Sequence, residues 1–156
     1  MQFRIIASGQ LKSGPERDLI DQYSERIRAG GASLALGPLT ETQIDARNFR
    51  DKASESAALA SKVPDGAALC LLDERGKALT SREFAFTLAR WRDDGIRDAA
   101  FVIGGADGLD RTAFRSPDLV LSFGKLVWPH MLVRAMLAEQ LYRAVSILSG
   151  APYHRD

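Results

Sequence analysis

The chain has 156 residues, of which 46% are hydrophobic and 26% charged, and its formal net charge is +1. This length and composition are typical of one globular domain that buries its own core. A net charge so close to zero argues against a protein that holds nucleic acid by charge alone. An RNA-binding surface would therefore have to gather its basic groups on one face or recognise shape.

The sequence gives no sign of an oxidising compartment or a membrane. The single cysteine, Cys70, cannot form an internal disulfide bond, and its place in the apolar run 67–72 predicts a core residue. The chain starts without the features of a signal peptide, and no apolar run reaches the roughly 18 residues of a membrane span. We therefore expect a cytoplasmic protein. The two histidines, His130 and His154, have no acidic cluster at metal-ligand spacing, so no metal site is expected.

The first half of the chain predicts two strands and two helices. Residues 3–7 form a short apolar strand, and Pro15 is well placed to open a helix whose apolar residues recur at helical spacing as far as Ile27. A glycine pair ends this helix. Residues 33–36 predict the second strand, and residues 49–63 predict an alanine-rich helix that a Pro-Asp-Gly turn ends.

The second half of the chain continues the alternation. Residues 67–72 are continuously apolar, which is typical of a strand buried on both faces of a parallel sheet. Thr80 and Glu83 form a capping box at the start of the third helix. Two more apolar strands are predicted at 99–103 and 119–123.

The longest predicted helix spans residues 131–148 and ends at Gly150. One stripe of this helix is apolar, and it consists of Val133, Met136, Leu137, Leu141, Val145 and Leu148. Glu139 and Arg143 are four residues apart, a spacing typical of a surface ion pair.

The order of these elements predicts an α/β fold, with residues 1–156 forming a single domain around a mainly parallel sheet. In such sheets ligands bind beyond the carboxyl ends of the strands. Three segments follow predicted strands and should meet at that edge: 73–76, 104–108 and 123–130.

The first two of these segments are ambiguous by themselves. The glycines of 104–108 let a ligand approach backbone amides closely, but a tight turn explains them equally well. Their spacing is not the G-x-G-x-x-G of dinucleotide-binding folds. Asp73 has the position of a catalytic base at a strand end, but a solvated turn is the favoured interpretation.

The C-terminal residues 152–156 differ from an ordinary polar chain end. Tyr153, His154 and Arg155 bring together an aromatic ring, an imidazole and a guanidinium, a set suited to stacking on bases and contacting phosphate. From the residues alone, this role and that of a simple chain end are equally favoured.

Several segments together resemble the ribosomal RNA large subunit methyltransferase H family, within the SPOUT class of methyltransferases. The segments are 72–73, 101–109, 121–123, 128–130, Arg134, 139–144 and 153–155. The resemblance covers essentially the full length and is most specific in the glycine segment and the C-terminal part. Two positions depart from the family's pattern: Ala106 stands where proline is common, and Gln10 stands where lysine is common.

The resemblance implies a feature that periodicity does not reveal, a deep C-terminal trefoil knot that binds S-adenosylmethionine. Knots are rare exceptions to the topology rules, so the pattern of elements alone predicts an ordinary doubly wound sheet. The resemblance also implies methyl transfer to N3 of pseudouridine 1915 in 23S rRNA on the assembled ribosome. The enzyme would act as a homodimer in which the partner chain completes each site.

By the same resemblance, the cofactor-binding residues are Leu72, Gly104, Phe123, Gly124, Lys125, Leu126, Val127 and Trp128. Backbone groups there can read the adenine edge while apolar side chains enclose its ring. We expect Gly104→Val to place a branched side chain in the cofactor's path while leaving the protein folded. The residues expected to contact RNA are Arg134, Tyr153, His154 and Arg155.

The implied reaction needs few catalytic groups, because a sulfonium is a strong electrophile and alignment supplies much of the rate. The N3–H group must lose its proton, and Arg143, Arg155 or a protonated His154 would favour the resulting anion. The candidate catalytic residues are therefore His130, Arg143 and His154. The two histidines are candidates for the general base by residue type alone.

Two other functions stay open. One is a SPOUT methyltransferase that modifies another rRNA or tRNA position, and the other is a non-catalytic α/β protein that binds the ribosome. A receiver-like domain is disfavoured, because residues 7–9 at the end of the first strand are Ala-Ser-Gly rather than an acidic cluster.

Overall fold

The computed structural model describes residues 1–154, which form one sheet of five parallel strands in the order β2-β1-β4-β3-β5. The strands are β1 (Gln2–Ser8), β2 (Leu39–Ile44), β3 (Ala68–Ala78), β4 (Asp98–Ile103) and β5 (Leu119–Ser122). The helices are α1 (Pro15–Gly31), α2 (Lys52–Ala60), α3 (Ser81–Asp93) and α4 (His130–Ser149). Short 3-10 turns lie at Ala32–Leu34, Ala46–Asn48 and Arg111–Ala113.

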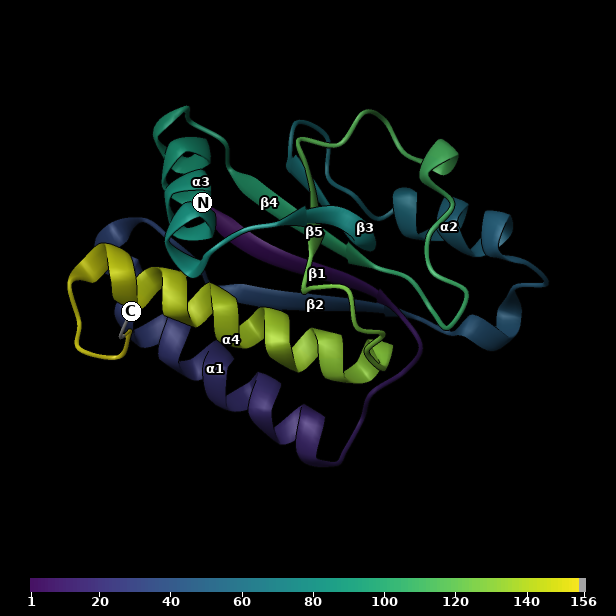
Figure 1. The fold of residues 1–156 in the computed structure, drawn as a ribbon, viewed down its shortest axis with the longest axis horizontal. Coiled ribbons are helices and arrows are strands. Elements are labelled where there is room, and N and C mark those ends of the chain that lie inside the picture. The colour runs from purple at the N-terminus through teal and green to yellow at the C-terminus, as the bar shows by residue number, and fades with distance from the viewer. Residues whose placement is uncertain (155–156) are drawn as a thin grey trace.

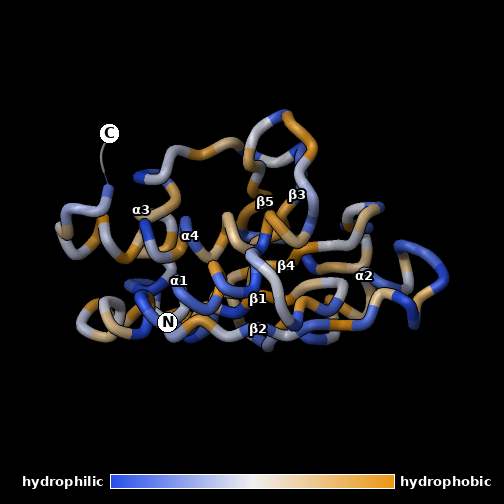
Figure 2. Tube along the Cα trace, turned by 90° about the horizontal axis from the view of Figure 1, so that it is seen from below, coloured by the Kyte–Doolittle hydropathy of each residue, from blue (hydrophilic) through white to orange (hydrophobic). Residues whose placement is uncertain are grey.

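Helices α1, α3 and α4 cover one face of the sheet, and α2 covers the other (Figure 1). Alternate residues of the central strand β4 point to opposite faces. Phe101 packs in the cluster beneath α1, α3 and α4, whereas Val102 packs in the cluster that contains Leu59 of α2. Figure 2 shows hydrophobic residues gathered along the strands β3, β4 and β5. The central strands are therefore buried on both faces, as their continuous apolar runs predict.

Most of the predicted elements are confirmed, and local signals set their ends. Helix α3 has the predicted capping box, in which the Thr80 N–H donates to Glu83 at 2.7 Å and the Glu83 N–H donates to the Thr80 hydroxyl at 3.2 Å. Helix α4 ends at Gly150, which has a φ of 71°. Helix α2 is shorter than predicted, because Asp51 caps its start by accepting the Ser54 N–H at 2.8 Å.

The prediction of a strand at 33–36 is wrong. Residues 32–34 form a 3-10 turn, and Leu36 is buried in the loop that follows. The second strand is instead β2, an edge strand whose residues alternate between half-buried and exposed until its last residue, Ile44. Because such a strand needs no apolar run, a search for apolar runs does not find it.

Strand β3 is longer than predicted, since residues 73–76 do not leave the sheet as a simple turn. The pairing of β3 with β5 shifts between Leu72 and Lys77, and the strand continues to Ala78. Such a shift is typical of a β-bulge, which bends a strand and changes the direction of its side chains. Asp73 therefore lies in a bulge at the carboxyl edge of the sheet.

The structure also bears on Cys70, on membrane-spanning helices, on metal-binding groups and on the predicted knot. Cys70 is fully buried in β3, as predicted, and burial raises the pKa of its thiol. Across residues 1–154 no helix is long and apolar enough to cross a membrane. In the same part of the chain, no group of three His, Cys, Asp or Glu side chains is placed to hold a metal ion. The strand order does not by itself establish the trefoil knot, which stays a prediction.

Candidate active site at the carboxyl edge of the sheet

The carboxyl ends of β3, β4 and β5 and the first turn of α4 surround a cavity of about 240 Å³. Every predicted cofactor-binding residue except Lys125 lines this cavity, namely Leu72, Gly104, Phe123, Gly124, Leu126, Val127 and Trp128. His130, a candidate catalytic residue, lines it as well. The fold thus brings together three segments that are far apart in the sequence, as expected for the edge of a parallel sheet.

The glycine loop, residues 104–110, forms one wall of the cavity. The loop is closed by the Gly108 N–H, which donates to the Gly105 carbonyl at 3.1 Å. A Cβ atom on Gly104 would lie 2.6 Å from the Gly108 carbonyl oxygen, closer than real Cβ atoms come to another atom. The expected effect of Gly104→Val needs correction, because the side chain would strike the backbone of the loop and deform the wall itself.

The loop that follows β5 forms the opposite wall. Ser122 fixes its start, since the Gly124 N–H donates to the Ser122 hydroxyl at 3.1 Å. Trp128 closes it, because its indole N–H donates to the Phe123 carbonyl at 3.3 Å. Between these contacts Leu126 is 69% exposed and Val127 84% exposed. Exposed apolar side chains beside a cavity are typical of a surface that a ligand or a partner covers.

Asp73 lies at the cavity but is engaged in ion pairs. Its carboxylate accepts the Arg75 N–H at 2.8 Å and the Arg111 guanidinium at 3.0 Å. Burial acts to raise the pKa of Asp73, but these two contacts outweigh it and the pKa is lowered. Asp73 is therefore an ionised partner of Arg111, which does not suit it to the role of a general base.

His130 is the first residue of α4 and is partly buried at the cavity. Burial is the main cause that lowers the pKa of its imidazole, and the neighbouring Arg134 lowers it further. Glu55 acts in the opposite direction without reversing the shift. His130 is therefore neutral at neutral pH, and a neutral imidazole has one ring nitrogen that can accept a proton.

Arg134 does not occupy the place expected of an RNA contact. The side chain is fully buried, and its guanidinium donates to the carbonyl oxygens of Ser8 and Gly9, the latter at 2.6 Å. It also donates to Glu41 at 3.2 Å. Within a single chain Arg134 faces the sheet one turn after His130, and its expected contact with RNA stays a prediction.

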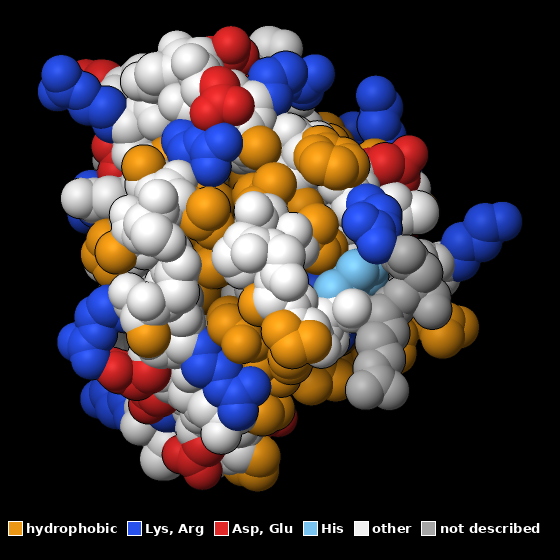
Figure 3. All heavy atoms as spheres, turned by 90° about the vertical axis from the view of Figure 1, so that its left-hand side faces the viewer, with side chains coloured by type: hydrophobic (Ala, Val, Ile, Leu, Met, Phe, Trp, Pro, Cys, Tyr) orange, Lys and Arg blue, Asp and Glu red, His pale blue; other side chains and the backbone are white. Residues whose placement is uncertain are grey.

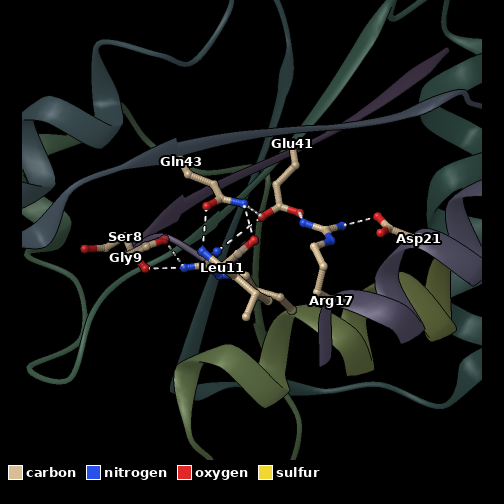
Figure 4. Close-up of polar contacts among 8 residues, drawn as sticks. Ser8, Gly9, Leu11, Arg17, Asp21, Glu41 and Gln43 are labelled. Carbon is tan, nitrogen blue, oxygen red and sulfur yellow. Dashed lines mark hydrogen bonds and ion pairs between the residues drawn. The ribbon is translucent and has the colours of Figure 1, made fainter. Parts of the chain in front are cut away.

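The acceptors of Arg134 belong to a larger polar network between the sheet and α1 (Figure 4). Glu41 of β2 also accepts from Arg17 at 2.9 Å and from Gln43 at 2.5 Å. The Gln43 amide oxygen accepts the Leu11 N–H at 2.7 Å. Together with Arg134, these contacts fix the loop after β1 and the start of α4 to the edge of the sheet.

The C-terminal residues fold back onto α4. The Tyr153 ring packs on Tyr142 with centroids 4.7 Å apart, and its hydroxyl donates to Glu139 at 3.0 Å. The Arg143 guanidinium lies 4.8 Å from the Tyr153 ring and 3.3 Å from Nδ1 of His154. Within a single chain Tyr153 therefore packs on its own helix, and contact of the tail with RNA stays a prediction. Arg155, also expected to contact RNA, lies outside the described residues.

The candidate catalytic residues are not all brought together within one chain. His130 lies at the first turn of α4, whereas Arg143 and His154 meet near the last turns. Arg143 follows His130 by thirteen positions in the helix, which corresponds to roughly 20 Å along the helix axis. One chain therefore cannot place all three residues around one substrate base.

A second cavity of about 530 Å³ lies between α1, α4 and the end of β5. Tyr23 of α1 and Met136 of α4 line it, and it shares Phe123 and Gly124 with the first cavity. Leu19 on its rim is 40% exposed. On a different face, at the left of Figure 1, basic side chains are scattered among acidic and hydrophobic ones and do not form a single basic patch (Figure 3).

Sequence reasoning missed the polar side chains of α2 that support the glycine loop. Glu55 accepts the Gly105 N–H at 3.0 Å, and Ser56 accepts the Asp110 N–H at 2.9 Å. The available signal was a run of three polar residues, 54–56, inside an otherwise alanine-rich helix. That signal is weak, because polar residues on a surface helix are common.

Comparison with known proteins agrees with this architecture. A family model described as "Predicted SPOUT methyltransferase" matches residues 1–154, which assigns the chain to that class of enzyme. A probable methylase family protein from Haemophilus influenzae superposes with a TM-score of 0.52 at 15% identity, covering 99% of this chain and 70% of the other. A putative methylase family protein from Neisseria gonorrhoeae gives 0.50 at 15% identity, covering 99% and 86%. These two structures show a likeness of fold alone.

Sequence relatives place the chain more narrowly. The ribosomal RNA large subunit methyltransferase H of Maricaulis maris is 57% identical over 156 residues, covering 100% of both chains. The protein of the same name from Roseobacter denitrificans is 53% identical, again over 100% of both chains. The chain therefore belongs to the ribosomal RNA large subunit methyltransferase H family of SPOUT methyltransferases.

Proposed function

We propose that this methyltransferase uses S-adenosylmethionine to methylate N3 of pseudouridine 1915 in 23S rRNA on the assembled ribosome. The observation that carries the proposal is the cavity at the carboxyl edge of the sheet, formed by the residues that the family resemblance assigns to the cofactor. The names of the full-length relatives support a ribosomal RNA substrate for this chain as well. Such a reaction takes place in the cytoplasm.

The lining of the cavity supports S-adenosylmethionine as its ligand. Its wall contains Gly104, Gly105 and Gly108, and residues without side chains let backbone groups lie close to a ligand. Leu72, Leu126 and Trp128 supply apolar surface for the adenine ring. When bound, the cofactor would supply an activated methyl group, so the protein's own task is to align the acceptor nitrogen and to take its proton.

His130 and Arg143 differ in charge and therefore suit different steps of the reaction. His130 is neutral and lies at the cavity, which suits it to accept the N3 proton. Arg143 keeps its charge, since its pKa is raised, mainly by its hydrogen bond with Glu139. A guanidinium favours the anion that forms when N3 loses its proton. Arg143 together with His154 is therefore suited to bind the base and to stabilise its anionic form.

A homodimer would resolve the distance of roughly 20 Å that separates these groups along α4. The second cavity lies on the α1 and α4 face, and its mainly apolar lining suits contact with another copy of the chain. A two-fold arrangement makes every contact twice, so each partner can complete the other's site. We propose that His130 of one chain and Arg143 of its partner form one active site.

Mixing two inactive variants tests the shared site. We expect His130→Ala and Arg143→Ala each to lose methyl transfer, and a refolded equal mixture to recover about a quarter of the wild-type rate. Half of randomly assembled dimers are mixed, and each mixed dimer holds one intact site of two. No recovery in a mixture shown to contain mixed dimers would place both residues in the same chain's site.

Transfer of a radiolabelled methyl group tests the activity itself. The acceptors are assembled ribosomes from cells that lack the protein, compared with wild-type ribosomes and with transfer RNA. We expect labelling of the first acceptor alone. Labelling of transfer RNA or of another rRNA position would support a different SPOUT specificity, and ribosome binding without transfer would support a non-catalytic role.

A further inference from the structure

Helix α2 lies on the face of the sheet opposite α1, α3 and α4 and contributes no residue to the lining of the cofactor cavity. Two adjacent side chains of this helix nevertheless hold the glycine loop at both of its ends. Glu55 accepts the N–H of Gly105 at 3.0 Å, and Ser56 accepts the N–H of Asp110 at 2.9 Å. These contacts join residues 50 and 54 positions apart in the sequence.

The fit between Glu55 and Gly105 is steric as well as polar. A Cβ on Gly105 would lie 3.0 Å from one carboxylate oxygen of Glu55 and 3.3 Å from the other. It would also lie 3.4 Å from the hydroxyl of Ser8, which is fully buried and has no hydrogen-bond partner among the described residues. The absence of a side chain at Gly105 is therefore what lets the carboxylate reach the loop backbone.

The contact between Glu55 and Gly105 also fixes the orientation of a peptide group. In a trans peptide the N–H and the preceding carbonyl point in opposite directions. Binding of the Gly105 N–H to α2 therefore directs the Gly104 carbonyl away from α2. Both glycines line the cavity, so the direction of this peptide determines which polar atoms the wall presents.

The support beneath the loop is itself rigid. Ser56 is fully buried, and Leu59 one turn later is buried in the same hydrophobic cluster as Leu109 of the loop. Asp51 caps the start of α2. A short helix held at its start and along its buried face can position the loop, and a preformed loop binds its ligand without an ordering cost.

We propose that Glu55 and Ser56 are positioning residues that hold the glycine loop in the shape that binds the cofactor. This inference rests on the proposed use of S-adenosylmethionine. It assigns to α2 a role in cofactor binding that acts through backbone N–H groups rather than through contact with the ligand.

Substitutions of Glu55 separate the hydrogen bond from the charge. Glu55→Ala removes the acceptor, whereas Glu55→Gln keeps a carbonyl oxygen of similar reach. We expect Glu55→Ala to weaken S-adenosylmethionine binding by about tenfold or more, the factor for loss of a hydrogen bond to a charged group. We expect Glu55→Gln to stay within about threefold of wild type, because a neutral acceptor retains part of that bond. The KM for the cofactor should follow the binding constant.

The matched control is Ser61→Ala at the far end of the same helix. The Ser61 hydroxyl donates to the Ala58 carbonyl at 2.7 Å, so its loss disturbs α2 without touching the loop. We expect this variant to bind the cofactor as wild type does. A general loss of stability would lower the melting temperature of any α2 variant but would not raise KM selectively.

Hydrogen exchange in the ligand-free protein gives a readout that does not depend on the cofactor. We expect the Gly105 amide to exchange faster in Glu55→Ala than in wild type or in Glu55→Gln. Unchanged exchange would overturn the inference whatever ligand the cavity takes. Equal loss of affinity in the Ala and Gln variants would also overturn it, since charge rather than the hydrogen bond would then matter. Wild-type protein that fails to bind S-adenosylmethionine would contradict the proposed function alone.

Discussion

Replacement of the buried Arg134 by methionine should destabilise the protein more than any surface substitution of an arginine. Methionine keeps the unbranched apolar part of the side chain and removes the guanidinium. The variant leaves the carbonyls of Ser8 and Gly9 without their donor and removes one of the cations beside Glu41. Removing one partner from a buried ion pair typically costs about 3–5 kcal/mol.

The contacts of Glu41 indicate that Arg134→Met destabilises the protein by an amount at the lower end of that range. Glu41 keeps Arg17 at 2.9 Å and Gln43 at 2.5 Å, so its carboxylate stays paired. We therefore expect a loss of about 3 kcal/mol in the free energy of unfolding. For a chain of this length 1 kcal/mol corresponds to about 2–4 °C, so the melting temperature should fall by about 6–12 °C.

Thermal and urea unfolding at one fixed protein concentration measure this change, so that any self-association affects all variants in the same way. The control is Arg28→Met, which removes an exposed arginine paired with Glu25. That variant should change stability by no more than about 0.5 kcal/mol. If Arg134→Met melts at the same temperature as Arg28→Met, the network around Arg134 does not stabilise the fold as described.

Three further predictions concern the cavity and the C-terminal residues. Gly104→Ala should abolish binding of S-adenosylmethionine in calorimetry by deforming the glycine loop, while Gly30→Ala in α1, where a Cβ has room, should bind normally; normal binding by both would refute the steric argument. An NMR titration should give His130 a pKa below the usual histidine value, and Arg134→Met should raise that pKa. The contribution of neutral His130 to stability should be lost as pH falls below the usual histidine pKa, because the unfolded chain binds the proton more readily. An unshifted pKa would contradict this. Tyr153→Phe should lower the free energy of unfolding by about 1 kcal/mol through loss of one hydrogen bond, and equal unfolding midpoints would show that the tail does not pack as described.

The parts of the fold that the sequence predicts well are those that local signals determine. The capping box of Thr80 and Glu83, the end of α4 at Gly150 and the apolar central strands all follow from short segments of sequence. The edge strand β2 was missed because a strand with one exposed face carries polar residues such as Thr40 and Thr42. Its apolar neighbour Leu36 is buried from a loop, which a pattern of hydrophobicity cannot distinguish from a strand.

The candidate site was also predicted only in those features that follow from the local sequence and the order of elements. The sequence predicted which segments meet at the carboxyl edge, because that follows from the order of strands and helices. The side-chain roles depend on contacts between distant segments and were less accessible. Arg134 is a charged residue in a helix, and only its contacts with Ser8, Gly9 and Glu41 reveal that it is buried. The role of Glu55 was equally hidden, because it depends on a contact with Gly105, which is 50 positions away in the sequence.

The most direct test of the central claim is mass mapping of 23S rRNA from cells with and without this protein. We expect pseudouridine 1915 to lack one methyl group in cells without the protein. The wild-type gene should restore the methyl group, and the gene for Gly104→Ala should not. An unchanged methyl group at that position in cells without the protein, or loss of a methyl group elsewhere in the RNA, would contradict the proposed function.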